Sequence, residues 1–261
     1  MSKKITFISG LILASILLMG GCFPSVNRPA EKTATCVQSG GDSFPGKARI
    51  DAVIFDMDGT LLDSLPAWDH ATAKYLRTRG IEMPEEINAA IQKLSLLEGA
   101  RYVKEQLGLP ESAEELLEAV LFSVRQHYVT DILPKPGAVE LLKELKAQGI
   151  KISVATAANK DLATAAFARL GMLEYIDFMM DCEEVGTGKR DPAIYYAVLQ
   201  RLGTRKERTL VVEDALYALE TAKKAGFLTA GVFDPIYTDL EEKKLQRTAD
   251  YFFFSLETCI K

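Results

Sequence analysis

From Ile50 onward, short β-rich runs alternate with amphipathic stretches, and this alternation limits the possible folds more than any other feature. The expected strands are residues 52–55, 152–155, 178–180, 209–212, 228–232 and 251–253. Helical patterns cover residues 137–148, 163–170, 192–202 and 215–225. Such alternation predicts an α/β protein with a Rossmann-like core of three layers, in which helices cover both faces of a parallel sheet.

One long interval breaks this alternation. Between residues 64 and 133 the sequence shows only helical pattern, interrupted by Gly and Pro. We therefore expect an inserted α-helical cap domain of four or five helices over residues 65–132. The core domain would then consist of residues 49–64 and 133–261.

The N-terminus differs from the rest of the chain. Lys3 and Lys4 precede an uncharged apolar run over residues 5–19, which is followed by two glycines and Cys22. This pattern indicates a secretory signal peptide over residues 1–21. The run is short for a membrane-spanning helix, which needs roughly 20 apolar residues. The segment LLMGGC also resembles the lipobox of bacterial lipoproteins, which implies lipidation of Cys22.

Residues 22–48 are rich in Pro, Ser, Gly and Thr and are expected to form a flexible tether. The protein would then lie outside the cytoplasm, held to the membrane only through its N-terminal lipid or signal anchor. The alternatives are an uncleaved anchor and a misassigned start ahead of a cytoplasmic enzyme. The four cysteines form no CxxC pair and predict neither a disulfide framework nor a zinc site.

Charge limits the possible partners. The 261 residues carry a net charge of −5 and contain no long basic run, which argues against nucleic acid as the main partner. A small anionic substrate is compatible with this balance if local cations neutralise the site. We favour a monomer.

The stretch VIFDMDGT at residues 53–60 places Asp56 and Asp58 at the end of the first expected strand. In open parallel sheets, ligands bind beyond the carboxyl ends of the strands. Two neighbouring carboxylates raise each other's pKa unless a cation lies between them. A hard divalent ion with oxygen ligands, such as Mg²⁺, resolves this conflict. For this motif alone, a solvated turn is the ordinary alternative.

Three further polar positions follow in order along the chain. Thr156 comes directly after the second sheet strand, Lys189 lies in the loop GTGKRDP, and Glu213–Asp214 follow another apolar run. Each has an ordinary interpretation, as a helix cap for Thr156 and for the acidic pair, and as a solvated charge for Lys189. Together, however, the four positions form an ordered set of acidic pair, hydroxyl, lysine and acidic pair.

This set strongly resembles the four motifs of the haloacid dehalogenase (HAD) superfamily, from about Ile50 to the C-terminus. The helical insertion after the first motif is similar to that of the subfamily with phosphoglycolate phosphatases, β-phosphoglucomutases and sugar-phosphate phosphatases. The resemblance implies a phosphatase that uses Mg²⁺ as cofactor. Its partner would be a small phosphorylated metabolite, a phosphate monoester hydrolysed through an aspartyl-phosphate.

The resemblance also implies a role for each acidic residue. Asp56 would be the nucleophile, and Asp58 would protonate the leaving alcohol and then deprotonate the attacking water. Asp56, the backbone carbonyl of Asp58, and Asp214 would hold Mg²⁺, with Glu213 assisting directly or through water.

Thr156 and Lys189 would bind the phosphoryl oxygens and stabilise the charge of the transition state. The family's lysine loop usually reads GKPxP, and here Arg190 replaces the first proline. We expect Arg190 to be a surface charge rather than a phosphate ligand.

Other residues separate the possible activities within the superfamily. Haloacid dehalogenases and phosphonate hydrolases lack an aspartate equivalent to Asp58. β-Phosphoglucomutases usually carry Val at the position of Thr60 and His at the position of Trp68, so a phosphatase is favoured over a phosphosugar mutase. A non-catalytic surface lipoprotein that retains the fold is the remaining alternative, and the phosphate ester itself stays open.

Overall fold

A computed structural model describes residues 44–91, 94 and 96–259 of the chain. Cys22, the expected signal peptide and most of the expected tether lie outside these residues. The described residues form two compact units. Residues 68–126 make up the helical unit, and residues 44–67 together with 127–259 make up the core unit.

The helical unit contains no strand among its described residues. Its helices are α2 (Ala71–Thr78), α3 (Glu85–Ile91), α4 (Leu96–Leu107) and the greater part of α5 (Ala113–Thr130). The chain passes between the two units twice, within the short helix α1 (Leu65–Trp68) and within α5. Among the described residues, no helix combines the length and apolar character needed to cross a bilayer.

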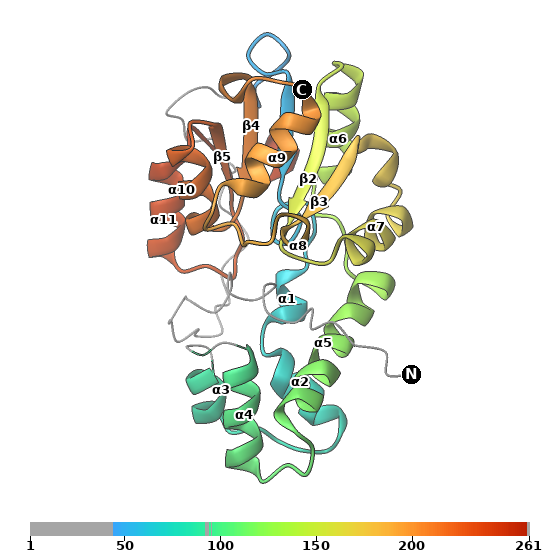
Figure 1. The fold of residues 1–261 in the computed structure, drawn as a ribbon, viewed down its shortest axis with the longest axis vertical. Helices are drawn as coiled ribbons and strands as arrows, with labels where there is room; N and C mark the ends of the chain where they lie inside the picture. Colours follow the sequence, from blue (N-terminus) through green and yellow to red (C-terminus); the bar gives the residue numbers. More distant parts are fainter. Residues whose placement is uncertain (1–43, 92–93, 95, 260–261) are drawn as a thin grey trace. The chain divides into compact units, whose positions relative to one another are not determined.

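The core unit is built on a six-stranded parallel sheet with the strand order β3-β2-β1-β4-β5-β6 (Figure 1). Its strands are β1 (Ala52–Phe55), β2 (Lys151–Thr156), β3 (Phe178–Asp181), β4 (Thr209–Glu213), β5 (Leu228–Val232) and β6 (Tyr251–Phe253). Every residue of β1 and β4 is buried, as expected for central strands that are covered on both faces. The predicted Rossmann-like parallel core is confirmed.

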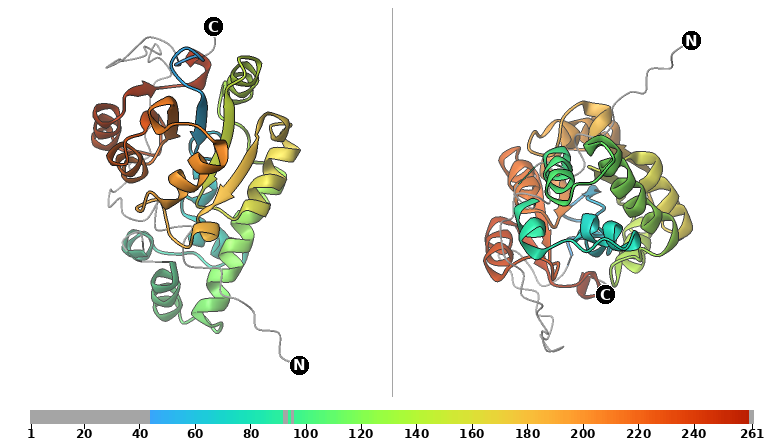
Figure 2. Two further views of the ribbon diagram at one scale, coloured as in Figure 1. Left: turned by 45° about the horizontal axis from the view of Figure 1, so that its top comes forward. Right: turned by 90° about the horizontal axis from the view of Figure 1, so that it is seen from below.

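Helices cover both faces of this sheet. The helices α6 (Ala138–Ala147) and α7 (Lys160–Arg169) lie on one face, as Figures 1 and 2 show. The other face carries α9 (Ala193–Leu202), α10 (Leu216–Lys224) and α11 (Asp239–Thr248). Because right-handed crossovers leave β1 and β4 toward opposite sides, the carboxyl ends of these neighbouring strands form the topological switch point of the sheet.

Two helices of the core unit were not expected from the sequence. The short helix α8 (Cys182–Val185) begins at a capping box formed by Asp181 and Glu184. Helix α11 is mostly charged, and it begins at a second capping box, in which Thr238 and Glu241 satisfy each other's backbone amides. The two helices were missed because neither carries an apolar stripe of useful length.

The folded region begins earlier than the sequence indicated. Phe44, which falls within the expected 22–48 tether, is buried in the core unit. Its ring stacks on Phe253 at a centroid distance of 5.4 Å and on Phe55 at 6.4 Å. The boundary expected between residues 48 and 49 is therefore too late, because an aromatic side chain beyond it completes the core.

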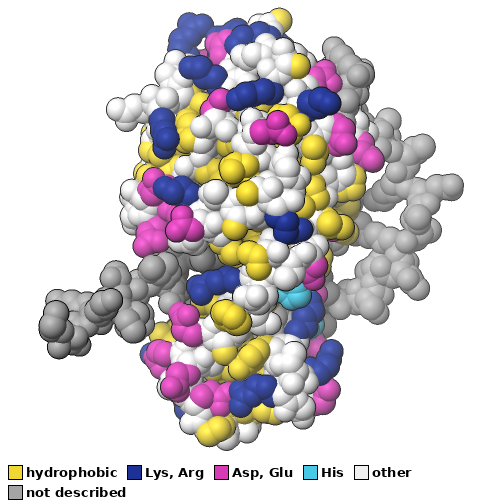
Figure 3. Space-filling model, turned by 90° about the vertical axis from the view of Figure 1, so that its right-hand side faces the viewer, with side chains coloured by type: hydrophobic (Ala, Val, Ile, Leu, Met, Phe, Trp, Pro, Cys, Tyr) yellow, Lys and Arg dark blue, Asp and Glu magenta, His cyan; other side chains and the backbone are white. Residues whose placement is uncertain are grey.

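Charged side chains of both signs are interspersed on the face of the molecule drawn in Figure 3. Among the described residues on that face, acidic and basic groups lie close to one another, and no broad area of one sign is visible. Such a face carries no basic stripe of the kind that follows a nucleic-acid backbone.

Candidate active site

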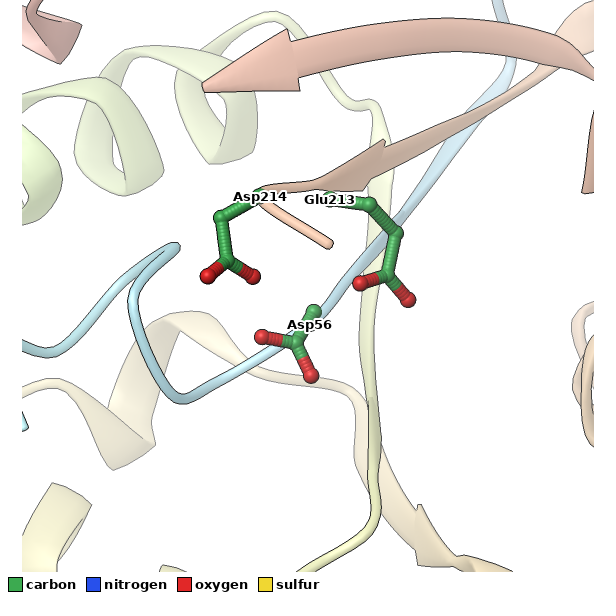
Figure 4. Close-up of side chains that lie close together, drawn as sticks. All are labelled: Asp56, Glu213 and Asp214. Atoms are coloured by element: carbon green, nitrogen blue, oxygen red, sulfur yellow. The ribbon is translucent and has the colours of Figure 1, made fainter. Parts of the chain in front are cut away.

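Three carboxylates meet at the switch point of the sheet. Phe55 of β1 pairs with Val212 of β4, and the backbone amide of Asp56 donates to the carbonyl of Val212 at 2.9 Å. Adjacent parallel strands end at the same edge of a sheet, so Asp56 lies beside Glu213 and Asp214 (Figure 4). One oxygen from each of the three side chains lies within 4.8 Å of the others. All three residues are buried.

The turn after Asp58 depends on a glycine. Gly59 has a φ of +78°, in the left-handed region that side chains other than glycine disfavour. A Cβ atom at this position would overlap the carboxylate of Asp214 and lie 2.8 Å from Leu65. Gly59 therefore allows the first loop to approach the end of β4 closely enough to form the site.

Lys189 is the cation within the cluster. It is buried in the loop between α8 and α9, and its ammonium group donates to Asp56 Oδ1 and, at 2.8 Å, to Glu213 Oε1. Burial disfavours the charged form, but the carboxylates of Asp56 and Glu213 outweigh it and raise the pKa of Lys189 above its ordinary value. The lysine is therefore charged and is not the solvated loop residue of the ordinary interpretation.

The acidic pair at the end of β4 is held by hydroxyl groups. Glu213 Oε1 accepts from the hydroxyl of Tyr195 at 2.8 Å. Asp214 Oδ1 accepts from Thr60 at 3.3 Å, and Asp214 Oδ2 accepts from Tyr237 at 2.7 Å. Neither acidic residue caps helix α10, whose N-cap is Ala215 without a side-chain hydrogen bond. Their carboxylates are therefore available to the cluster.

Buried negative charge dominates the electrostatics of this cluster. Burial, opposed by Lys189 and reinforced by Asp56 and Asp214, raises the pKa of Glu213 to about 8. Burial and the nearby charge of Asp56 raise the pKa of Asp214 to about 7.

Such a donor set fits a divalent cation. When all three carboxylates are ionised, as cation binding requires, the single ammonium group leaves two negative charges without a partner inside the cluster. Hard oxygen donors with this excess charge suit a divalent ion such as Mg²⁺.

Asp58 lies at the same edge, but its side chain is directed elsewhere. Its Oδ1 atom accepts from Ser64 at 2.6 Å and from the hydroxyl of Tyr128 at 2.5 Å. Burial and the charge of Asp56 raise the pKa of Asp58 to about 6, against the lowering effect of the two hydrogen bonds. The Asp58 side chain is not a member of the three-carboxylate cluster. It can exchange a proton near neutral pH.

Thr156 is the last residue of β2, and it is buried. Its hydroxyl accepts from the backbone amide of Ala158 at 2.9 Å. Helix α7 is capped by Asn159, whose side chain accepts from two amides of the first turn. The helix-cap interpretation of Thr156 is therefore wrong. Because β2 lies next to β1, its carboxyl end, where Thr156 lies, is at the same edge of the sheet as Asp56.

Three tyrosines of the site were missed in the sequence. The hydroxyl of each donates a hydrogen bond to one acidic residue: Tyr128 to Asp58, Tyr195 to Glu213, and Tyr237 to Asp214. They come from α5, from α9 and from the loop after β5, so no local spacing relates them to the motifs.

Arg190 is exposed, as predicted, and its guanidinium lies 4.6 Å from the ring centroid of Tyr217. Replacing proline at this position thus adds a cation–π contact to the lysine loop.

Comparison with known proteins agrees with this geometry. Residues 50–226 match the model of a hydrolase family described as haloacid dehalogenase-like hydrolase. The chain is 32% identical over 177 residues to a phosphorylated carbohydrates phosphatase of Thermotoga maritima, covering 68% of this chain and 82% of that protein. It is 33% identical over 185 residues to a phosphoglycolate phosphatase of Rhodospirillum rubrum, covering 67% of this chain and 76% of that protein.

A similar fold occurs among solved structures. A crystal structure from Thermotoga maritima, assigned provisionally as a beta-phosphoglucomutase, superimposes with a TM-score of 0.71 at 29% identity. The superposition covers 81% of this chain and 97% of that one.

Proposed function

This chain belongs to the haloacid dehalogenase-like hydrolase family, and we propose that it is a Mg²⁺-dependent phosphatase that acts through an aspartyl-phosphate. The two relatives named above are both phosphatases and place the chain among phosphoric monoester hydrolases. The observation that carries the finer proposal is the buried cluster of Asp56, Glu213 and Asp214 with Lys189 between two of its carboxylates.

Asp56 is the proposed nucleophile. Lys189 binds its Oδ1 atom, which leaves Oδ2 to attack the phosphorus of the ester. As the bond from Asp56 to phosphorus forms, the bond from phosphorus to the ester oxygen breaks, and Asp58 gives its proton to the departing alcohol. Water then attacks the phosphorus, Asp58 takes up its proton, and inorganic phosphate leaves Asp56.

Residues of this chain would both hold the cation and bind the reacting phosphoryl group. The side chains of Asp56, Glu213 and Asp214, with the backbone carbonyl of Asp58, would hold the cation. When bound, Mg²⁺ would shield the charge between Asp56 and the incoming phosphate. Thr156 and Lys189 would bind the phosphoryl oxygens. Thr156 lies at the carboxyl end of β2, and Lys189 reaches Asp56 from the loop before α9.

The substrate class follows from the relatives. Phosphatases of phosphorylated carbohydrates and of phosphoglycolate are similar to this chain over more than 170 residues, so we propose a small sugar phosphate or a phosphoglycolate-like acid. A mutase is the second candidate, because of the structural likeness to a provisional beta-phosphoglucomutase. Thr60 and Trp68 favour the phosphatase, because mutases of this kind usually carry Val and His at these positions.

Phosphate release from a panel of sugar phosphates and 2-phosphoglycolate tests the proposal directly. The purified full-length chain should release phosphate from at least one of them in the presence of Mg²⁺, and Asp56→Asn should abolish this activity. Asp63→Asn, an exposed aspartate in the same loop, is the matched control and should retain it. Turnover by Asp56→Asn would refute the assigned nucleophile, and interconversion of hexose phosphates without phosphate release would reveal the mutase.

We also propose that the enzyme is exported and tethered by a lipid on Cys22. Support comes only from the signal-like first 21 residues and the lipobox resemblance. Metabolic labelling with a fatty acid should mark the wild-type chain and leave Cys22→Ser unmarked. An unlabelled product found in the cytoplasm would show instead that the start is misassigned.

A further inference from the structure

We infer that Tyr237 is a positioning residue that orients Asp214 for a divalent cation and thereby sets the affinity of the site for that cation. The inference rests on the proposed function, because it concerns the same metal site. It adds a residue that lies outside all four motifs and in the loop between β5 and α11. The observation behind it is a hydrogen bond of 2.7 Å from the Tyr237 hydroxyl to Asp214 Oδ2.

Asp214 is held from several sides. Thr60 donates to its Oδ1 atom at 3.3 Å, Tyr237 donates to Oδ2, and the carboxylate packs against the backbone of Gly59. A carboxylate oxygen can accept two hydrogen bonds or metal contacts. Each oxygen of Asp214 therefore keeps room for a cation while the donated bonds fix the plane of the group.

The loop that carries Tyr237 is itself fixed. Asp234 accepts from the backbone amide of Ile236 at 2.9 Å through its side chain and from the amide of Tyr237 at 3.2 Å through its carbonyl. The buried ammonium of Lys135 lies 2.7 Å from Asp234 Oδ2 and donates to the carbonyl of Phe233 at 2.9 Å. These contacts place the Tyr237 hydroxyl before any cation arrives.

The far end of the loop is also anchored. Thr238, the next residue after Tyr237, is the N-cap of helix α11 and exchanges hydrogen bonds with Glu241. A tyrosine held between a turn and a helix cap loses little further freedom when it binds its partner. The hydrogen bond to Asp214 is therefore preorganised, which is the property that raises the affinity of a metal site.

Tyr237 acts as a donor and not as a metal ligand. Its hydroxyl donates to Asp214 Oδ2 at 2.7 Å, and a phenolic hydroxyl keeps its proton at neutral pH. Partners that orient a metal-binding carboxylate in this way typically contribute a factor of about 10 to 100 in metal affinity. We expect loss of the hydroxyl to weaken cation binding by about this factor.

Tyr237→Phe in the full-length chain removes the hydroxyl and keeps the ring. Isothermal titration with MgCl₂ should give a dissociation constant at least about 10-fold higher than that of the wild type. The Mg²⁺ concentration that gives half of the maximal rise in melting temperature should increase in parallel. Tyr196→Phe is the matched control, because its hydroxyl donates to the carbonyl of Ala225 on the protein surface. The control should bind Mg²⁺ like the wild type.

The outcomes separate this inference from the function on which it rests. If the wild type binds Mg²⁺ and Tyr237→Phe binds it within about twofold as tightly, the positioning role is wrong and the metal site stands. If the wild type binds no divalent cation, the metal-dependent function fails, and the inference fails with it. Melting curves recorded without metal check that both variants are folded, so that a weaker affinity reports on the site.

Discussion

Lys189 lies between two carboxylates that would otherwise face each other at close range in a buried site. At the residue scale, one ammonium group and several hydroxyl groups therefore partly compensate the negative charge of three acidic side chains. Breaking a buried ion pair by removing one partner is costly, because the remaining charge is left without compensation. When its carboxylates are ionised, the cluster has more negative than positive charge, and this excess favours binding of a cation.

Lys189→Met should abolish most activity and destabilise the metal-free protein. Loss of a group that stabilises transition-state charge lowers kcat by about 10²-fold or more. The unpaired Asp56 and Glu213 should lower the free energy of unfolding by roughly 3–5 kcal/mol.

Lys160→Met is the control for Lys189→Met, since Lys160 pairs with Glu184 at 2.7 Å on the surface. Such exposed pairs contribute about 0–1 kcal/mol. Phosphate release and chemical denaturation of both variants test the prediction, and equal effects of the two substitutions would contradict it.

The stability of the metal-free protein should depend on pH in a defined direction. Burial raises the pKa of Glu213 from 4.5 to about 8 and that of Asp214 from 3.8 to about 7. The folded protein therefore holds protons that the unfolded chain releases, so the free energy of unfolding falls as the pH rises through this interval. Because a cation needs both groups deprotonated, the rise in melting temperature caused by Mg²⁺ should grow over the same interval. Melting curves between pH 5 and 8.5 should show this, and a Mg²⁺ effect independent of pH would oppose it.

The sequence singled out most of the residues that the structure brings together in the candidate site, but not the groups that orient them. The charged residues of the cluster could be recognised because each follows a strand or lies in a loop, and because their order along the chain matches that of a known set of motifs. These residues are Asp56, Lys189 and the acidic pair at 213–214. The tyrosine hydroxyls were not found. A single tyrosine carries no pattern, and its partner is decided by tertiary packing.

At the scale of secondary-structure elements, the buried strands were the most predictable part. The bounds of β1, β5 and β6 agree with the prediction because apolar runs between turn residues leave little choice. Helix α11 was missed because its sequence, DLEEKKLQRT, offers few apolar positions. The signal that would have revealed it is the pattern Thr238-x-x-Glu241, a capping box readable without any structure.

The turn between β1 and the helical unit should not tolerate a side chain at Gly59. Gly59→Ala would combine a positive φ with overlap against Asp214 and Leu65, so it should lower stability by about 2 kcal/mol or more and weaken Mg²⁺ binding. Gly149→Ala is the control, because Gly149 has a φ of +69° and a Cβ atom added there would meet no other atom within 4 Å. It should cost only about 1 kcal/mol and leave Mg²⁺ binding intact. Thermal melts and Mg²⁺ titrations of both variants provide the test, which the account fails if Gly59→Ala binds Mg²⁺ normally.

At the scale of the whole molecule, the chain combines a helical unit with a core unit that carries all of the proposed catalytic residues. Alternation of strands and helices predicted the architecture of the core, and its interruption predicted an insertion over residues 65–132. The helical unit of the structure spans residues 68–126. The N-terminal limit of the core was misjudged, because residues 44–48 have the composition of a linker. Only the three-dimensional packing shows that Phe44 is part of the core.

Phe44 should therefore contribute to the stability of the core. Phe44→Ala removes a buried ring that stacks on Phe253, and it should lower the free energy of unfolding by about 3 kcal/mol. Phe122→Ala is the control, because Phe122 is 61% exposed and the loss of its side chain should change stability by less than about 0.5 kcal/mol. Denaturant titrations compare the two, and an unchanged midpoint for Phe44→Ala would mean that the core begins after this residue.

Identification of the phosphorylated residue during turnover tests the whole account most directly. The full-length chain is mixed with a ³²P-labelled phosphate ester that it hydrolyses, quenched in acid within milliseconds, digested and mapped by mass spectrometry. The account predicts a phosphoryl group on Asp56, removable by hydroxylamine as an acyl phosphate is, and absent from Asp56→Asn. Steady release of phosphate with no acyl phosphate on Asp56, or with the label on another residue, would contradict it.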